Sequence, residues 1–250
     1  MSRRVLITGS ALGLGLGLAR AFAAAGDRVF LTDIDPQVTA AAEGLATPSL
    51  VLDLKTDGAA ARLMQAAGAA MGGVDILVNN AVVRTMAPVA DLPDPAWDRA
   101  LEVNLSAPFR LIRAVLPGMQ AQGWGRIINM ASVYSLIALA GRADYVTTKH
   151  AIIGLTRTVA LELAATDITC NAICPGLMAT DSALARIDAL AAERGITRDE
   201  AERLFLSTRQ PGGKFIPMET VTALALFLCG PASAGLNGAA IPVDNGWSFA

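Results

Sequence analysis

The feature that most constrains the fold of this chain is the alternation of short apolar runs with longer helical patterns. The runs are continuous and rich in β-branched residues, as in strands that are covered on both faces of a parallel sheet. The repeat predicts an α/β fold with a single doubly wound parallel sheet of about seven strands, helices on both faces and right-handed crossovers. We expect strands at 5–8, 29–32, 50–52, 76–78, 127–130, 168–173 and 239–243, and helices at roughly 14–25, 57–71, 97–121, 144–165 and 218–229.

One segment breaks this rhythm. Residues from about 179 to 210 are polar, helical in pattern and inserted between the last two expected strands. Such an insertion is expected to form a substrate lid over a site at the carboxyl edge of the sheet. No Pro-, Ser- or Gly-rich linker divides the 250 residues, and no internal repeat is present, so we expect one domain, 1–250.

Charge and reactive side chains exclude several classes of function. Lys and Arg number 20 against 22 Asp and Glu, which does not suggest nucleic acid or an anionic membrane as a partner. His150 is the only histidine and the three cysteines lack metal-ligand spacing, so neither a metal site nor a Ser-His-Asp triad is expected. The alanine-rich stretch at 59–70 is too short to span a bilayer. A reducing, cytoplasmic compartment is the expectation.

A glycine-rich turn follows the first expected strand and opens the first helix. Gly9, Gly13 and Gly15 let the backbone turn sharply and approach a pyrophosphate, whose charge favours a helix N-terminus. The spacing Gly-x-x-x-Gly-x-Gly differs from the usual Gly-x-Gly-x-x-Gly, and a glycine-rich turn can also be only a turn. Its place between a strand and a helix favours the nucleotide-binding turn of a Rossmann-type sheet.

Asp33 ends the second expected strand. A carboxylate there accepts hydrogen bonds from the adenosine ribose hydroxyls and repels a 2′-phosphate, and no Lys or Arg lies in the turn or just after Asp33. The sequence therefore favours NAD over NADP, although Asp33 can also be read as a turn residue before Pro36. Asp53 and the Asn-Asn-Ala segment at 79–81 follow other strands at the same edge, where ligands bind in open α/β sheets.

Ser132, Tyr145 and Lys149 carry groups that can move a proton on and off an alcohol. A phenol titrates near pH ~10, and an ammonium beside it favours the phenolate. Residues four apart share a helix face, so Lys149 can lie near Tyr145, and the Ser132 hydroxyl can hydrogen-bond a substrate oxygen. Tyr-x-x-x-Lys alone is weak, because any solvated amphipathic helix can carry it.

Together these elements resemble the short-chain dehydrogenase/reductase family over nearly the whole chain. The resemblance implies that Tyr145 is the general acid/base, that Lys149 lowers its pKa and binds the nicotinamide ribose, and that Ser132 positions the substrate. Hydride chemistry would belong to the cofactor, and proton transfer to the protein. The motifs that carry it are Thr8-Gly9-x-x-x-Gly13-x-Gly15, Asn79-Asn80-Ala81, Asn104, Ser132, Tyr145-x-x-x-Lys149 and Pro175-Gly176 followed by Thr180.

The resemblance also assigns supporting roles. Asn104 would hold a water that links Lys149 to solvent, and Val82 departs from the family, which usually has glycine there. The implied cofactor contacts are Gly9, Ser10, Leu12, Gly13, Leu14, Gly15, Asp33, Asp53, Leu54, Asn80, Ala81, Tyr145, Lys149, Pro175, Gly176, Met178 and Thr180. A homotetramer, paired through the helices at 97–121 and 144–165, is implied as well.

Within the family, the second half is most similar to D-3-hydroxybutyrate dehydrogenases. Those enzymes bind a carboxylate through glutamine, histidine and lysine and close the pocket with tryptophan. Guanidinium groups at three of these places favour an anionic hydroxy acid or keto acid, one bulkier or more charged than 3-hydroxybutyrate; alternatively, one or two of them are surface residues. The corresponding positions here are Arg84, Tyr134, Arg142, Leu177 and Arg186.

Three functions remain to be compared. The first is an NAD-dependent secondary-alcohol dehydrogenase acting on a small hydroxy acid. The second keeps this chemistry but acts on a neutral polyol, sugar or cyclic alcohol, which the arginines disfavour. The third is an NAD-binding regulator without catalysis, since a fold does not fix a function. The complete set of Asn104, Ser132, Tyr145 and Lys149 argues against a regulator.

Overall fold

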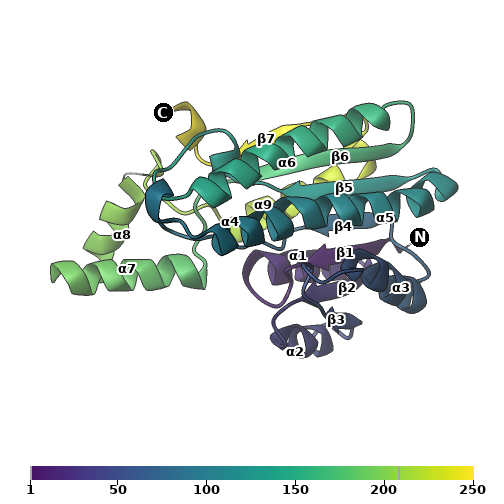
Figure 1. Ribbon diagram of the computed structural model, residues 1–250, viewed down its shortest axis with the longest axis horizontal. Coiled ribbons are helices and arrows are strands. Elements are labelled where there is room, and N and C mark those ends of the chain that lie inside the picture. The colour runs from purple at the N-terminus through teal and green to yellow at the C-terminus, as the bar shows by residue number, and fades with distance from the viewer. Residues whose placement is uncertain (1, 208) are drawn as a thin grey trace.

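The protein, described here by a computed structural model that covers residues 2–207 and 209–250, is built around one sheet (Figure 1). In the described residues the sheet has seven parallel strands in the order β3-β2-β1-β4-β5-β6-β7, which confirms the predicted fold class. The strand order reverses between β1 and β4, and ligands bind at such a point in open α/β sheets. The strands are β1 (Arg4–Thr8), β2 (Arg28–Asp33), β3 (Ser49–Val51), β4 (Ile76–Asn79), β5 (Gly125–Met130), β6 (Ile168–Pro175) and β7 (Ala240–Val243).

Helices cover both faces of the sheet. Successive strand residues point to opposite faces, so Val5 and Ile7 pack under α1, α2 and α9, whereas Leu6 packs under α3, α5 and α6. The α-helices are α1 (Gly13–Ala24), α2 (Gln37–Glu43), α3 (Ala59–Met71), α4 (Asp94–Leu101), α5 (Ala107–Gln122), α6 (Ala143–Glu162), α7 (Asp181–Arg194), α8 (Arg198–Ser207) and α9 (Met218–Leu228). Single turns of helix lie at η1 (Val89–Asp91), η2 (Glu102–Ser106), η3 (Val133–Ser135), η4 (Pro231–Ser233) and η5 (Trp247–Phe249).

The helix predicted at 97–121 is present as continuous helical backbone over 94–122, but it contains a π-helical turn that was not predicted. The structure has α4 and α5 there, joined by η2, a π-helical turn. Pro108 explains the interruption, because it has no N–H to donate to the carbonyl of residue 104, four positions earlier. The π-helical turn widens the helix where Asn104 lies, and such turns are frequent at functional sites.

The segment expected at about 179–210 contains α7 and α8, which project beyond the carboxyl edge of the sheet (Figure 1). They share a small apolar core of their own, formed by Ile187, Ala201 and Phe205. Among the described helices, none combines the length and the apolar character that a membrane-spanning segment requires.

Candidate active site

The glycine-rich turn between β1 and α1 allows three chain segments to touch. A Cβ at Gly9, whose φ is +64°, would lie 2.6 Å from the Cα of Ala81. A Cβ at Gly15 would lie 2.0 Å from the carbonyl oxygen of Gly9. Both distances are shorter than atoms tolerate, so these two positions require glycine for close packing.

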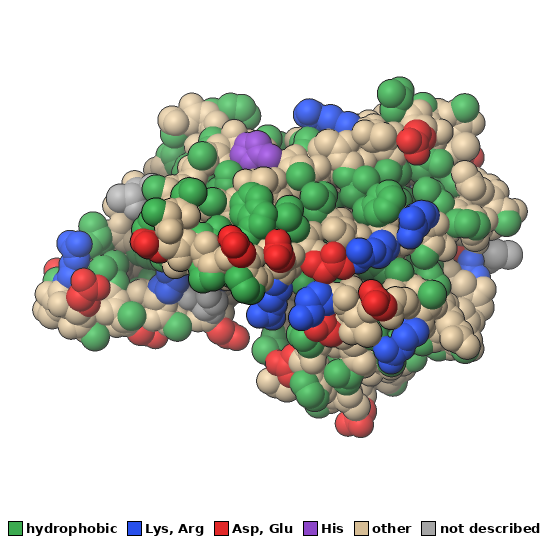
Figure 2. Space-filling view, in the orientation of Figure 1, with side chains coloured by type: hydrophobic (Ala, Val, Ile, Leu, Met, Phe, Trp, Pro, Cys, Tyr) green, Lys and Arg blue, Asp and Glu red, His purple; other side chains and the backbone are tan. Residues whose placement is uncertain are grey.

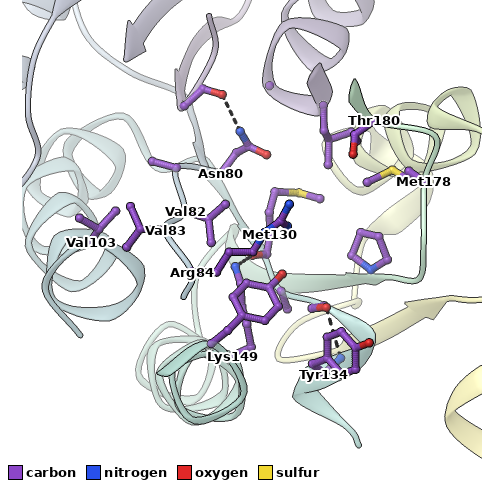
Figure 3. Close-up of a pocket in the computed structure, with 18 of the residues that line it drawn as sticks. Asn80, Val82, Val83, Arg84, Val103, Met130, Tyr134, Lys149, Met178 and Thr180 are labelled. Atoms are coloured by element: carbon purple, nitrogen blue, oxygen red, sulfur yellow. Dashed lines mark hydrogen bonds between the residues drawn. The ribbon is translucent and has the colours of Figure 1, made fainter. Parts of the chain in front are cut away.

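The segment after β4 is fastened to this turn by hydrogen bonds. The Thr8 hydroxyl accepts from the backbone N–H groups of Asn80 and Ala81, each at 3.0 Å. The Asn80 side-chain amide donates to the carbonyl oxygens of Thr8 (3.0 Å) and Gly9 (2.8 Å), the second of which appears beside Asn80 in Figure 3. These bonds fix the position of the segment after β4 relative to the glycine-rich turn, and so fix the shape of the crevice between β1 and β4.

The N-terminus of α1 can accept an anion in this crevice. Its N-cap residue, Leu12, provides no side-chain acceptor for the first backbone N–H groups, and the helix runs for 12 residues. A helix N-terminus with such N–H groups favours a phosphate, and the glycines leave room for it. The turn therefore fits the pyrophosphate of a dinucleotide, which would be held by the backbone of Leu12 to Gly15.

Asp33 and Asp53 lie at one end of the cavity that begins at this turn. The Asp33 carboxylate accepts the backbone N–H groups of Ala11 and Asp35, both at 3.0 Å, which ties the turn to the end of β2. The Asp53 carboxylate accepts the N–H of Lys55 at 3.0 Å. Each carboxylate retains acceptor capacity for a ribose hydroxyl.

Two predicted cofactor contacts lie off the cavity wall. Ser10 is fully buried, and its hydroxyl donates to the carbonyl oxygens of Ile7 and Thr32 and accepts the N–H of Thr32. The side chain of Ser10 therefore joins β1 to β2 rather than facing a ligand. Gly13 supplies a positive φ of +55° to the turn without lining the cavity. The other predicted cofactor contacts line it: Gly9, Leu12, Leu14, Gly15, Asp33, Asp53, Leu54, Asn80, Ala81, Tyr145, Lys149, Pro175, Gly176, Met178 and Thr180.

Ser132, Tyr145 and Lys149 meet in the same cavity, which has a volume of about 440 Å³, within the range of small-molecule sites. The Ser132 hydroxyl lies near enough to the Tyr145 phenol to oppose the rise in its pKa. The Lys149 ammonium donates to the carbonyl oxygen of Met130 at 2.5 Å and lies 5.6 Å from the centre of the Tyr145 ring. The end of β5 and one face of α6 thus place a hydroxyl, a phenol and an amine together.

The charges around Tyr145 differ from those expected. Burial raises the pKa of its phenol, and Ser132 and the charges of Arg84 and Arg142 oppose that rise. Burial lowers the pKa of Lys149 to about 8. The sequence identified Lys149 as the cation that acts on the phenol, and it did not anticipate this contribution of the two arginines. Figure 3 shows Arg84 and Lys149 next to each other, reaching the cavity from the segment after β4 and from α6.

Asn104 lies behind this group rather than on the cavity wall. Its side-chain oxygen accepts the N–H of Val83 at 2.9 Å, and its amide donates to the Val83 carbonyl oxygen (2.8 Å) and the Thr148 hydroxyl (3.1 Å). Asn104 therefore fastens the segment after β4 to α6. Its role in a water relay stays a prediction.

Asp144 is a supporting residue that the sequence reasoning missed. It is buried, and its carboxylate accepts the N–H of Thr85 at 2.7 Å and the N–H of Tyr145 at 2.6 Å. Ala87 and Arg142 form an isolated β-bridge beside it. The start of α6 and the segment that carries Arg84 are therefore fixed to each other. The position of Asp144, just before Tyr145, was the available signal.

All five residues predicted to contact substrate line the cavity, together with Arg209, which was not predicted. The Tyr134 ring packs edge-on against Tyr145 and Trp247, with ring centres 6.2 Å and 5.4 Å away. Arg186 reaches the cavity from α7, and Leu177 from the segment after β6. Arg142 and Arg186 are partly buried and Arg84 is exposed, so the alternative that one or two of the three predicted arginines are surface residues stays open.

Comparisons with known proteins agree with a nucleotide-dependent oxidoreductase. The family model described as enoyl-(acyl carrier protein) reductase matches residues 9–248. D-beta-hydroxybutyrate dehydrogenases from Rhizobium meliloti (strain 1021) and Cupriavidus necator are 40% and 38% identical to the chain; the alignments cover 99% and 98% of it, and 99% and 97% of those relatives. The crystal structure of L-sorbose reductase from Gluconobacter frateurii with NADPH and L-sorbose superposes with a TM-score of 0.92 at 28% identity, covering 100% of this chain and 98% of that one.

These matches show the family. The chain belongs to the short-chain dehydrogenase/reductase family of oxidoreductases, as the sequence motifs predicted.

Proposed function

We propose that the chain is an NAD-dependent dehydrogenase that interconverts a secondary alcohol and a ketone on a small anionic hydroxy acid. One observation carries the proposal: Ser132, Tyr145 and Lys149 line the same cavity as the glycine-rich turn and a group of arginines. Bound nicotinamide would supply the hydride acceptor or donor. The similarity to the two D-beta-hydroxybutyrate dehydrogenases supports the substrate class.

The side chains around Tyr145 divide the work of proton transfer. In the direction of oxidation, the Tyr145 phenolate accepts the proton of the substrate hydroxyl while the carbon-bound hydrogen leaves as hydride. Ser132 holds the same substrate oxygen, so this oxygen and the phenol are aligned before the reaction. Arg84 and Arg142 favour the phenolate through their charge, and the Lys149 ammonium lies 5.6 Å from the centre of the ring.

The preference for NAD depends on Asp33. Its carboxylate is held at the end of β2 by the Ala11 and Asp35 N–H groups, where it would accept ribose hydroxyls and repel a 2′-phosphate. Because the similar L-sorbose reductase was crystallised with NADPH, the preference needs a direct test. We expect the chain to bind NADH more tightly than NADPH, and Asp33→Asn to shift the ratio of the two Kd values toward NADPH by about tenfold.

Isothermal titration calorimetry with the two reduced cofactors measures this ratio without any substrate. Asp35→Asn is the matched control, because it removes the same charge two residues away from a side chain that does not line the cavity. Tighter binding of NADPH than of NADH by the unaltered chain would contradict the preference.

The substrate class depends on the arginines. Arg142 lies at the start of α6, where its guanidinium donates to the Thr85 carbonyl oxygen at 3.4 Å and acts on the Tyr145 phenol. A guanidinium there can bind a carboxylate through two hydrogen bonds. With a panel of small hydroxy acids and neutral polyols, we expect NAD to be reduced with the acids. Arg142→Gln should raise KM for the acid by tenfold or more, because the loss of one hydrogen bond to a charged group has about this effect.

Arg62→Gln is the control, since Arg62 is exposed on α3 and far from the cavity lining. Oxidation of polyols but not of hydroxy acids would favour the second candidate, which the similarity to L-sorbose reductase supports. Tight NADH binding without turnover of any alcohol would favour a regulator.

Two further parts of the proposal concern assembly and closure. Apolar side chains gather over α5 and α6 on the face shown in Figure 2. Phe109 on α5 and Leu161 near the end of α6 are exposed. This surface supports a homotetramer paired through α5 and α6, which stays a prediction. The α7–α8 segment is proposed as a lid, because it brings Arg186 to the cavity from beyond the edge of the sheet.

A further inference from the structure

Five arginines in the described part of the chain line the cavity, and four of them come in pairs from two places in the fold, while Arg99 reaches it from α4. Arg84 and Arg142, the first pair, lie on the segment after β4 and at the start of α6. Arg186 and Arg209, the second pair, lie on α7 and just after α8. Each pair has its own structural support, and the two pairs lie within electrostatic reach of each other, since Arg186 and Arg84 both act on Arg142.

The first pair lies beside the reacting groups. Arg84 acts to lower the pKa of the Tyr145 phenol, and the Arg142 guanidinium donates to the Thr85 carbonyl oxygen. The carboxylate of Asp144, which accepts the Thr85 N–H, fixes the backbone between them. A carboxylate attached one or two bonds from the reacting carbon can therefore reach this pair.

The second pair is organised by one aromatic ring. The guanidinium carbons of Arg186 and Arg209 lie 5.4 Å and 4.4 Å from the centre of the Phe205 ring. Arg209 also donates to the carbonyl oxygen of Phe205 at 2.9 Å. Stacking on an aromatic face orients a guanidinium and leaves its N–H edge able to bind an anion.

The two pairs meet around Tyr134, whose phenol lies within the electrostatic reach of Arg209, Arg142 and Arg186. Burial lowers the pKa of Arg142 and of Arg186, and neighbouring arginines lower both further. Among the described residues of the cavity lining, the acidic side chains are Asp33 and Asp53, at the glycine-turn end. Grouping like charges in a partly buried place costs free energy that a bound anion offsets.

We propose that the substrate is a hydroxy acid with two carboxylates. The first pair would bind the carboxylate nearer to Tyr145, and the second pair the more distant one. A single carboxylate would engage one pair and leave the other as concentrated positive charge. This inference rests on the proposed function for the identity of the reaction, but the binding of two anionic groups can be measured without any turnover.

Binding of unreactive acids separates the two claims. Glutarate has two carboxylates and no hydroxyl, and its monomethyl ester has nearly the same shape with one charge fewer. With the NADH-saturated chain, we expect calorimetry to give glutarate a Kd about ten- to a hundredfold lower than that of the ester, since a charged contact typically contributes this much. Equal affinities of the two compounds would overturn the inference, whether or not any alcohol is oxidised.

Substitutions in the second pair test whether these arginines bind the second carboxylate. Arg209→Gln should reduce the preference for glutarate over the ester to less than threefold, whereas Arg203→Gln, an exposed change on α8, should leave it intact. If Arg209→Gln weakens both compounds equally, the second pair does not select the second charge. Arg186→Gln repeats the measurement if the Arg209 variant fails to fold.

Kinetics complete the test. We expect 3-hydroxyglutarate to have a kcat/KM at least tenfold above those of its monomethyl ester and of 3-hydroxybutyrate. Turnover of all three with equal kcat/KM would leave the proposed function standing and refute the dicarboxylate. Tight binding of glutarate without turnover of any hydroxy acid would refute the proposed reaction and support the two-anion site.

Discussion

Tyr145→Phe is expected to lower kcat by about a thousandfold, the size of effect that general acid–base catalysis typically supplies. The substitution removes only the phenol oxygen, whose pKa Ser132 and Arg84 both act to lower. The ring and its packing against Tyr134 remain, so the Kd for NADH should change less than threefold. Stopped-flow measurement of NADH formation, together with NADH titration, separates the two quantities.

The pH dependence of the same reaction provides a second test of the role of Tyr145. Because burial raises the pKa of Tyr145 above that of a free phenol, the phenolate is a minor fraction at neutral pH and grows as the pH rises toward that pKa. Alcohol oxidation by the unaltered chain should therefore accelerate with pH, and the Phe variant should lose this dependence. Tyr134→Phe, which removes the neighbouring phenol oxygen, should reduce kcat by less than tenfold. A kcat loss in Tyr134→Phe as large as that in Tyr145→Phe would refute the assignment.

Gly15→Ala is expected to remove cofactor binding and to lower the free energy of unfolding by about 3 kcal/mol, the upper range for overpacking. A Cβ at this position would lie 2.0 Å from the Gly9 carbonyl oxygen and 2.7 Å from the Asn80 side-chain nitrogen. The turn would have to move away from the segment after β4, which also breaks the bond from Asn80 to Gly9. Urea unfolding and NADH titration measure the two effects.

Gly68→Ala is the matched control for this substitution. Gly68 lies inside α3, and a Cβ there would meet nothing within 4 Å. Alanine in a helix interior is favoured over glycine by roughly 0.5–1 kcal/mol, so this variant should be slightly more stable and should bind NADH normally. Normal NADH binding by Gly15→Ala would show that the turn does not hold the pyrophosphate.

The sequence predicted the sheet well, because buried parallel strands produce continuous apolar runs that few other structures require. It missed α2, which is short and buries only Val38 and Ala42 along its length. It also joined α4 and α5 into one helix. The helical repeat of apolar residues continues through η2 and gives no sign of the π-helical turn. Only the missing N–H of Pro108 marks the turn in the sequence.

The candidate site was predicted in its central residues and less well around them. Tyr145 and Lys149 follow from helix spacing, and Ser132 from its place after a strand. Arg209 could not be found in this way, because it follows α8 without periodicity and its neighbour Phe205 is four residues away on that helix. Asp144 binds through backbone groups of Thr85 and Tyr145, and sequence patterns do not show which backbone groups meet.

The contact between Asp144 and Thr85 has a consequence for how this enzyme can diversify. It holds one side of position 84 through the Thr85 N–H, and Asn104 holds the other side through Val83, so neither attachment uses the Arg84 side chain. The Ala87–Arg142 bridge adds a further backbone attachment. The backbone at position 84 can therefore keep its place when its side chain is exchanged. A single substitution there would change specificity and the charge that acts on the Tyr145 phenol at the same time.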